Sequence, residues 1–194
     1  MRPATDSDLD ALCETLALAF DGDAWSQWTI AADDRQGRLR HLSRLFLSAD
    51  ALPHGEVWVT EGCEAVAVWQ PPGHRGPPDD VLETLGPAVA RLHGERFDAA
   101  ETANAVVESL RPEEPHWYLG SLATHPGHRG RGLGAAVLQP VLRRADAEGT
   151  VVAGDTSCER NLPFFARHGF EIARQADVPD GGPHLWLLRR APSG

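Results

Sequence analysis

The residues best suited to chemistry in this sequence form one glycine- and arginine-rich segment from Thr124 to Ala136, which reads T-H-P-G-H-R-G-R-G-L-G-A-A. A predicted strand, His116 to Thr124, precedes it, and a predicted helix, Leu133 to Glu148, follows it. A glycine-rich turn between a strand and a helix directs unpaired backbone N–H groups at one point, beside the positive end of the helix dipole. The segment therefore predicts a site for a phosphate-bearing, nucleotide-containing cofactor.

The side chains of this segment agree with that prediction. Gly130, Gly132 and Gly134 lack the Cβ atoms that would hold a pyrophosphate away from the backbone. Arg129 and Arg131 supply charge-assisted donors. Two other phosphate-binding loops fit less well. A P-loop needs a lysine, whereas the chain contains none, and a dinucleotide-binding loop normally opens the first strand–helix unit rather than following residue 120.

A second segment with a recognisable pattern begins at Asn161 and reads N-L-P-F-F-A-R-H-G-F. Asn161 is a suitable helix cap, Pro163 suits a first helical turn, and Gly169 suits a helix end. Neighbouring helical residues point about 100° apart, so only one of Phe164 and Phe165 is expected to face the core.

Both segments resemble motifs of the GNAT family of N-acetyltransferases. R-G-R-G-L-G resembles the family's Arg/Gln-x-x-Gly-x-Gly signature, and the Asn161 segment resembles its N-x-x-x-x-Tyr-x-x-x-G-F helix and turn. The resemblance implies one α/β domain over residues 1–194, with helices flanking a mixed central β-sheet in which a parallel pair of strands splays apart. It also implies acetyl-CoA (coenzyme A) as cofactor, with its pyrophosphate on the glycine-rich loop.

A closer resemblance, to the puromycin N-acetyltransferase branch of that family, extends over essentially the whole chain. It includes H-W-Y-L before the loop, D-T-S-C-E-R after it, and V-P-D-G-G-P-H-L-W-L-L-R near the C-terminus. The implied activity is transfer of an acetyl group to the primary amine of a small molecule, such as a puromycin-like aminonucleoside antibiotic, by direct attack in a ternary complex. The match is strong over 115–172 and diffuse over 20–53 and 73–112, where substrate choice is expected to reside.

The resemblance also assigns roles to individual residues. Backbone N–H groups of the splayed strand, Leu122 among them, would bind the thioester oxygen and the pantetheine amides. Asp155 ends a predicted apolar strand and is the candidate general base, unless it only forms a local hydrogen bond to Thr156, Ser157 or a helix N-terminus. The implied cofactor contacts are Leu122, Ala123, Thr124, Arg129, Gly130, Arg131, Gly132, Leu133, Gly134, Ala135, Asn161, Phe164 and Phe165.

Phe165 departs from the family pattern, because the usual residue there is a tyrosine that protonates the CoA thiolate. The loss of such an acid costs roughly 10²–10⁴-fold where proton transfer limits the rate. A thiolate whose conjugate acid has a pKa near 8.5 is nevertheless a tolerable leaving group. We therefore expect an enzyme without a dedicated acid; replacement by Cys158 or by Tyr118, the only tyrosine in the chain, stays open.

The candidates for the amine acceptor site are aromatic and acidic. Trp25 and Trp28 follow D-G-D in an expected loop, and together with Asp21 and Asp23 they would form a wall suited to a cationic amine. The alternative is that this loop packs only on its own helix. Two further candidates for the acceptor site come from the strand before the glycine-rich loop: Tyr118 and His116.

Composition limits the other possibilities. A chain of 194 residues with 42% hydrophobic residues is long enough for one domain with a full core. Three widely spaced cysteines give neither a disulfide framework nor a metal motif, and no membrane span or secretory signal is evident, so a cytoplasmic location is expected. The net charge of -10 disfavours nucleic acid and suits a cationic small molecule. Monomer and homodimer stay open, as do two other functions: acetylation of protein or peptide amines, and acyl-CoA binding without catalysis.

The predicted elements alternate between helices and strands. Helices are expected over 6–20, 35–48, 79–92, 98–110 and 133–148, with a shorter one from Asn161. Strands are expected over 57–60, 65–69, 116–124 and 151–155 and near Phe170 and Leu185, with a short first strand over 1–4.

Overall fold

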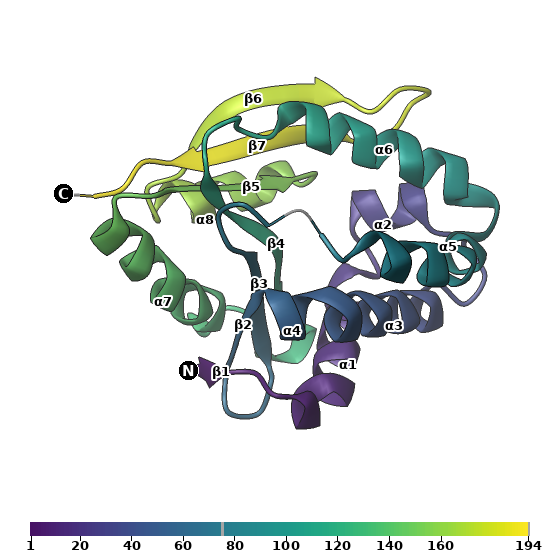
Figure 1. Ribbon diagram of the computed structural model, residues 1–194, viewed down its shortest axis with the longest axis horizontal. Helices are drawn as coiled ribbons and strands as arrows, with labels where there is room; N and C mark the ends of the chain where they lie inside the picture. Colours follow the sequence, from purple (N-terminus) through teal and green to yellow (C-terminus); the bar gives the residue numbers. More distant parts are fainter. Residues whose placement is uncertain (75, 194) are drawn as a thin grey trace.

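The structure is a computed structural model that describes residues 1–74 and 76–193. Its centre is a seven-stranded mixed sheet in the order β1-β2-β3-β4-β5-β7-β6, with helices on both faces (Figure 1). Only β4 and β5 pair in parallel among the described strands; the other neighbours are antiparallel. The strands are β1 Arg2–Pro3, β2 Glu56–Val59, β3 Ala65–Gln70, β4 His116–Thr124, β5 Val151–Thr156, β6 Glu171–Asp177 and β7 His184–Arg190.

The helices confirm most of the expected pattern and add two short α-helices, α2 and α4, that it did not contain. The α-helices are α1 Leu9–Phe20, α2 Ala24–Thr29, α3 Arg35–Phe46, α4 Leu52–His54, α5 Asp79–His93, α6 Phe97–Leu110, α7 Leu133–Glu148 and α8 Leu162–Ala166. The helix expected over 35–48 ends as an α-helix at Phe46 and continues as a π-helical turn, Leu47–Ala51, before α4. None of the described helices is long and apolar enough to cross a membrane.

The loop expected around Trp25 and Trp28 is wrong, because these residues form helix α2. The physical reason lies in the preceding residue. Asp23 is extended (φ -79°, ψ 143°), and its side chain accepts a hydrogen bond of 3.0 Å from the backbone N–H of Trp25. The carboxylate thus caps the helix, whereas the glycine in D-G-D had suggested a loop.

Helices cover the central strands on both faces, which explains why β3 is apolar and buried from Ala65 to Trp69 rather than alternating. On one face Trp69, Trp117 and Leu119 pack in a core cluster with α7 and α8. On the other face, α1 packs against β2 and β3, while Tyr118 and Ala153 share a cluster with residues of α6 and β7. In Figure 1, α6 runs along β7 and β6 at the upper edge.

The parallel strands β4 and β5 separate halfway along their length. Their pairing runs from His116–Val151 to Leu119–Gly154, after which β4 continues to Thr124 without β5 beside it. A Cβ atom on Gly154 would lie 3.1 Å from the Cβ of Leu119, so glycine permits the close approach at the last pair. On the other side of β4, a register shift opposite Val68 and Trp69 skips Gly120. Alternate amides of 120–124 therefore point away from β3 into the space that opens between β4 and β5.

An ion pair between a buried arginine and a partly buried aspartate joins α7 to the last strand. Arg190, which is 8% exposed, donates two hydrogen bonds to Asp146, of 2.7 and 2.8 Å. Asp146 also accepts a hydrogen bond of 2.7 Å from the backbone of Ser193, and Arg190 donates one of 3.0 Å to the carbonyl of His168. One guanidinium thus connects α7, β7 and the turn after α8.

Candidate active site

The glycine-rich segment forms a loop and helix start as the sequence predicts. His125 Nδ1 accepts a hydrogen bond of 3.1 Å from the backbone of Gly127, which sets a 3₁₀ turn, Pro126–His128. Gly130 and Gly132 both have φ 76°, in the left-handed region that glycine adopts without strain. No protein atom lies within 4 Å of the Cβ position of either residue. Within the protein, glycine is therefore required at these two positions by the backbone conformation and not by a lack of space for a side chain.

The start of α7 presents free backbone donors at this loop. The first helical hydrogen bond runs from the N–H of Ala136 to the carbonyl of Gly132, at 3.1 Å. The N–H groups of Leu133, Gly134 and Ala135 come before it and have no helical acceptor. They lie at the positive end of a 16-residue helix. These donors fit a phosphate group, and so the pyrophosphate of a nucleotide cofactor.

Gly134 has different surroundings from the two glycines before it. A Cβ atom there would lie at ordinary contact distance from its neighbours, 3.5 Å from Thr124 Oγ1 and 3.8 Å from Phe164 Cζ. The start of α7, the end of β4 and α8 therefore converge around Gly134. Three of the predicted cofactor-binding residues thus meet at one place.

The two arginines of the loop are exposed but already hydrogen-bonded. Arg129 donates to the carbonyl of Ala19 at 3.2 Å and to that of Thr124 at 3.4 Å, which ties the loop to the C-terminal end of α1. Arg131 Nη1 lies 3.1 Å from His128 Nδ1. A guanidinium carries five N–H donors, so both arginines keep donors for an anion.

Helix α8 follows β5 through a 3₁₀ turn, Glu159–Asn161, and Asn161 occupies its N-cap position. The prediction that the Asn161 side chain caps the helix is wrong. Because the preceding turn is already helical, Asn161 has φ -83° and ψ -20°, and its Nδ2 instead donates to Thr156 Oγ1 at 3.3 Å. The side chain therefore connects the start of α8 to the end of β5.

The two phenylalanines of α8 separate as helical geometry predicts. Phe165 is 6% exposed and packs edge-on against Phe170, with ring centroids 5.5 Å apart. Phe164 lies at the margin of the same core cluster, next to Gly134. The position from which a tyrosine would supply a proton is thus occupied by a core residue without a hydroxyl group.

Asp155 receives a hydrogen bond from the hydroxyl of Tyr118, donated to its Oδ1. The two residues lie on β5 and β4, beside the point where these strands separate. Tyr118 is 3% exposed, whereas Asp155 is only partly buried. The local alternatives for Asp155, hydrogen bonds to Thr156 or Ser157, are not formed; the carboxylate has a long-range partner instead.

Burial gives this pair unusual acid–base properties. Burial raises the pKa of Asp155 above its ordinary value, against the opposing effects of the Tyr118 hydrogen bond and the charge of Arg111. The pKa of Tyr118 lies well above its ordinary value, because the phenol is buried beside a carboxylate. Tyr118 therefore stays protonated as a donor, and Asp155 has a higher proton affinity than an exposed aspartate.

The remaining acceptor-site candidates lie on the same side of the sheet at different distances from this pair. The charge of Asp23 acts on Asp155, and its Oδ2 accepts a hydrogen bond of 3.3 Å from Ser157. Trp25 and Trp28 pack against the core cluster that contains Tyr118. The guanidinium of Arg96 lies 4.5 Å from the Trp28 ring centroid, so this ring already has a cation on one face.

His116 lies at the start of β4, two positions before Tyr118 and farther from the separation of the strands. Its ring centroid is 6.0 Å from that of Tyr118, and its Nδ1 lies 2.7 Å from the carbonyl of Glu114. These contacts give His116 a structural role, and an additional role in acceptor binding stays a prediction.

Residues 69–170 match the family model described as "Acetyltransferase (GNAT) family". This span is just over half of the chain and includes β4, the glycine-rich loop, α7, β5 and α8. The chain belongs to the GNAT family. It is a GNAT-family N-acetyltransferase, and its sheet, with a parallel pair that splays, has the family's fold.

Solved structures of other GNAT proteins share this fold over nearly their whole length. The crystal structure of histone acetyltransferase HPA2 and related acetyltransferase from Corynebacterium glutamicum has a TM-score of 0.74 and 23% identity, covering 100% of this chain and 96% of that one. The polyamine N-acetyltransferase of Drosophila melanogaster, which catalyses formation of N-acetylagmatine, has a TM-score of 0.63 and 15% identity, covering 98% of each chain. Identities this low show a common fold and no more.

A relative found by sequence matches only in part. A stretch of 79 residues is 35% identical to a probable serine/threonine-protein kinase of Dictyostelium discoideum. It covers 40% of this chain and 11% of that protein, so the GNAT chain spans a small fraction of this relative's length. No activity is inferred from this match.

Sequence reasoning missed one residue that contacts the candidate site, Arg111. Its guanidinium carbon lies 3.7 Å from the ring centroid of Tyr118, and its Nη1 donates to Gln70 Oε1 at 3.2 Å. Arg111 directly follows α6, within a stretch where the family resemblance is diffuse. No spacing in the sequence connects it with Tyr118 or Gln70, because all three come together only through the sheet.

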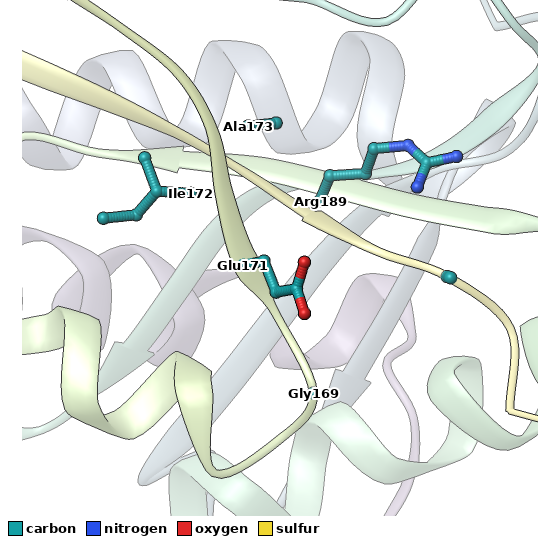
Figure 2. A pocket seen from close by; sticks show the side chains of 6 residues that line it. Gly169, Glu171, Ile172, Ala173 and Arg189 are labelled. Carbon is teal, nitrogen blue, oxygen red and sulfur yellow. The ribbon is translucent and has the colours of Figure 1, made fainter.

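A shallow depression of about 180 Å³ lies at the β6–β7 edge of the GNAT sheet (Figure 2). It occurs where a register shift leaves Ala173 unpaired in β6. Figure 2 shows Ile172 and Arg189 pointing to different sides, and Arg189 forms an ion pair of 3.0 Å with Glu114. Neither Asp155 nor the glycine-rich loop lines this depression, so it is separate from the candidate site. Its lining residues are Gly169, Glu171, Ile172, Ala173, Arg189 and Ala191.

Replacing Gly132 with Ala should destabilise the GNAT domain by about 1–2 kcal/mol, because a Cβ atom is strained at a φ of 76°. The substitution should also weaken CoA binding, since Gly132 sets the direction of the first N–H groups of α7. Thermal unfolding and titration calorimetry measure the two effects. Gly22, which has an ordinary φ and no atom within 4 Å of its Cβ position, is the matched control. Equal effects from the two substitutions would contradict this account.

Proposed function

We propose that this protein transfers the acetyl group of acetyl-CoA to the primary amine of a small cationic molecule, by direct attack in a ternary complex, with Asp155 as general base. The observation that carries the proposal is the position of the Tyr118–Asp155 pair. It lies beside the separation of β4 and β5, and the strand that carries Tyr118 leads directly into the phosphate-binding loop.

The residues for holding acetyl-CoA fit along one path. The amides at the start of α7 and the side chains of Arg129 and Arg131 would bind the pyrophosphate. The free amides of 120–124, with Leu122 near the middle, would bind the pantetheine arm and the acyl oxygen. Asn161 and Phe164 would flank this path from α8. When bound, acetyl-CoA supplies an activated acetyl thioester.

Asp155 would accept the proton that the amine loses as its nitrogen attacks the acyl carbon. The C–N bond would form as the C–S bond of the thioester breaks, Asp155 would take up the amine proton, and solvent would supply the proton for the leaving thiolate. Tyr118 occupies Oδ1 of the carboxylate and leaves Oδ2 for the acceptor. The raised pKa of Asp155 supports this role, because a base with higher proton affinity removes a proton from an ammonium more readily.

The acceptor that this site favours is a cation of modest size. Asp155 and Asp23 place two carboxylates near the reacting amine, within a chain whose net charge is -10. Trp25 and Trp28 add aromatic surface nearby. The neighbour from Drosophila acts on a polyamine, and the sequence resemblance suggests a puromycin-like aminonucleoside, which would give a role in antibiotic resistance. The free state of Cys13, Cys63 and Cys158 supports a cytoplasmic location as part of this proposal.

Two other functions have specific support. The neighbour from Corynebacterium is called a histone acetyltransferase, which favours a protein amine as acceptor. The burial of Phe165 in the core favours an acyl-CoA-binding protein that has lost catalysis. The Tyr118–Asp155 pair argues against the second of these, because binding alone does not need a carboxylate with a raised pKa.

A thiol-release assay with acetyl-CoA and a panel of amines tests the proposal. The panel contains puromycin, other aminoacyl nucleosides, aminoglycosides, polyamines and peptides, and CoA binding is measured in parallel by calorimetry. We expect turnover with one class of small cationic amine. Turnover with peptides alone would replace the proposed acceptor by a protein amine. CoA binding without any turnover would support the non-catalytic function.

A further inference from the structure

Arg111 connects the surface of the protein to the candidate base. Its guanidinium lies over the ring of Tyr118, with its central carbon 3.7 Å from the ring centroid. Gln70 fixes it on one side with a hydrogen bond of 3.2 Å to Nη1, and Glu108 lies 3.1 Å from its Nε. Arg111 is 24% exposed at the side chain, whereas Glu108 is 64% exposed. The cation is therefore partly removed from water and held by three neighbours.

Tyr118 contacts Arg111 through its ring and Asp155 through its hydroxyl group. Its ring is held by the guanidinium and by the core around Ala153 and Leu187, and it is 3% exposed. Its hydroxyl has Asp155 Oδ1 as acceptor. Because the side chain is packed on all these sides, the phenolic oxygen keeps its position beside Asp155 Oδ1. Arg111, Tyr118 and Asp155 thus form a continuous chain from a cation to a carboxylate.

We propose that Arg111 is a positioning residue for Asp155: it holds the Tyr118 ring so that the hydroxyl is directed at the carboxylate, and its charge keeps that carboxylate ionised at working pH. This inference rests on the proposed role of Asp155 as base. A stacked guanidinium suits the task better than an ammonium group, because it is planar, weakly hydrated and always charged.

The charged and polar groups around Asp155 act in opposite directions. Burial and the carboxylate of Asp23, in the segment before α2, both raise its pKa. The hydrogen bond from Tyr118 on β4 and the charge of Arg111, after α6, both lower it. Without the last two, a partly buried carboxylate near a second carboxylate would hold its proton more tightly. A protonated Asp155 cannot act as a base, so Arg111 would extend activity to lower pH.

The single tyrosine of the chain gives a direct way to observe this. In protein labelled with ¹³Cζ-tyrosine, one resonance arises, and it belongs to Tyr118. Its chemical shift at different pH reports the protonation of the carboxylate that accepts the phenolic hydrogen bond. This readout does not depend on catalysis. Asp155→Asn should abolish the titration and so assign it.

Arg111→Met removes the cation and keeps the bulk of the side chain. The midpoint of the tyrosine titration should move to higher pH, and kcat/KM below the wild-type midpoint should fall about tenfold, as expected when a carboxylate loses a nearby opposite charge. Arg111→Lys keeps the charge, so its tyrosine-titration midpoint should lie close to that of the wild type. Arg144→Met is the matched control. Arg144 lies 5.7 Å from the Trp117 ring centroid, on the opposite face of β4, and its removal should leave the midpoint unchanged.

The outcomes separate this inference from the proposed function. An unchanged midpoint in folded Arg111→Met, or the same shift in Arg144→Met, would overturn the role of Arg111. If Arg111→Met does not fold, Arg111→Lys provides the test. A tyrosine-titration midpoint equal to that of the wild type supports a charge effect. If the pH profile of activity in Arg111→Lys instead shifts as far as that of Tyr118→Phe, the charge effect is contradicted. Full activity in Asp155→Asn would instead remove Asp155 as base, whatever the resonance does.

Discussion

Replacing Asp155 with Asn should lower kcat for amine acetylation by roughly 10²–10⁴-fold, the usual contribution of a general base. Asparagine has nearly the same shape, and its Oδ1 still accepts the hydrogen bond of Tyr118, but it cannot take up a proton. CoA binding should be unchanged, because the loop residues that would bind it lie elsewhere. Steady-state thiol release and calorimetry measure the two quantities on the same preparation.

The same substitution should raise the melting temperature at neutral pH. Because the pKa of Asp155 is raised in the folded protein, ionisation of its carboxyl group reduces stability as pH rises through the folded-state pKa. Asparagine has no such ionisation, so the difference in melting temperature between the variant and the wild type should disappear below the ordinary pKa of aspartate. Asp177→Asn is the control, because this carboxylate is 81% exposed and paired with His184. Loss of less than tenfold in kcat for Asp155→Asn would show that Asp155 is not the base.

Replacing Asp146 with Ala should lower the free energy of unfolding by about 3 kcal/mol, the lower end of the cost of breaking a buried ion pair, because Arg190 is buried whereas Asp146 is 26% exposed at its side chain. The substitution leaves the guanidinium of Arg190 buried with only the His168 carbonyl and Ser193 as remaining partners. It also releases α7 from β7. Urea unfolding followed by tryptophan fluorescence measures the change.

The contribution of Asp146 should depend on pH in the opposite sense to that of Asp155. Arg190 lowers the pKa of Asp146, so the stabilisation is present above the ordinary aspartate pKa and is lost as pH falls through the lower, folded-state pKa. Asp10→Ala is the control: Asp10 is a surface partner of Arg44 and is 88% exposed at its side chain, so its loss should cost much less stability than the loss of Asp146. Similar losses of unfolding free energy in Asp146→Ala and Asp10→Ala would show that the Arg190–Asp146 pair stabilises the fold no more than a surface pair does.

The parts of the site that the sequence predicted are those set by short-range geometry. The glycine-rich loop and α8 could be predicted because their glycines, proline and helical spacing act within a few residues. The burial of Phe165 rather than Phe164 is consistent with the 100° between neighbouring helical residues, although the sequence did not say which of the two would be buried. The separation of β4 and β5 came from the family resemblance, and the pairing confirms it.

The features that sequence reasoning missed depend on residues far apart in the chain or on a misleading local signal. Arg111 reaches Tyr118 because α6 ends beside β4, and no pattern near either residue indicates this. Asn161 has its side chain on Thr156 because a 3₁₀ turn precedes α8. In the D-G-D segment, the glycine suggested a loop, whereas the capping carboxylate of Asp23 started α2.

The separation of β4 and β5 has a consequence for hydrogen exchange. Amides within the β3–β4 and β4–β5 ladders are protected by hydrogen bonds to neighbouring strands, whereas alternate amides of 120–124 lie beyond the last pair, Leu119–Gly154. In the free protein these amides should exchange with solvent deuterium far faster than those of the paired half of the same strand. A pantetheine arm bound along this segment would act as a missing strand, and slowed exchange in CoA would locate it amide by amide.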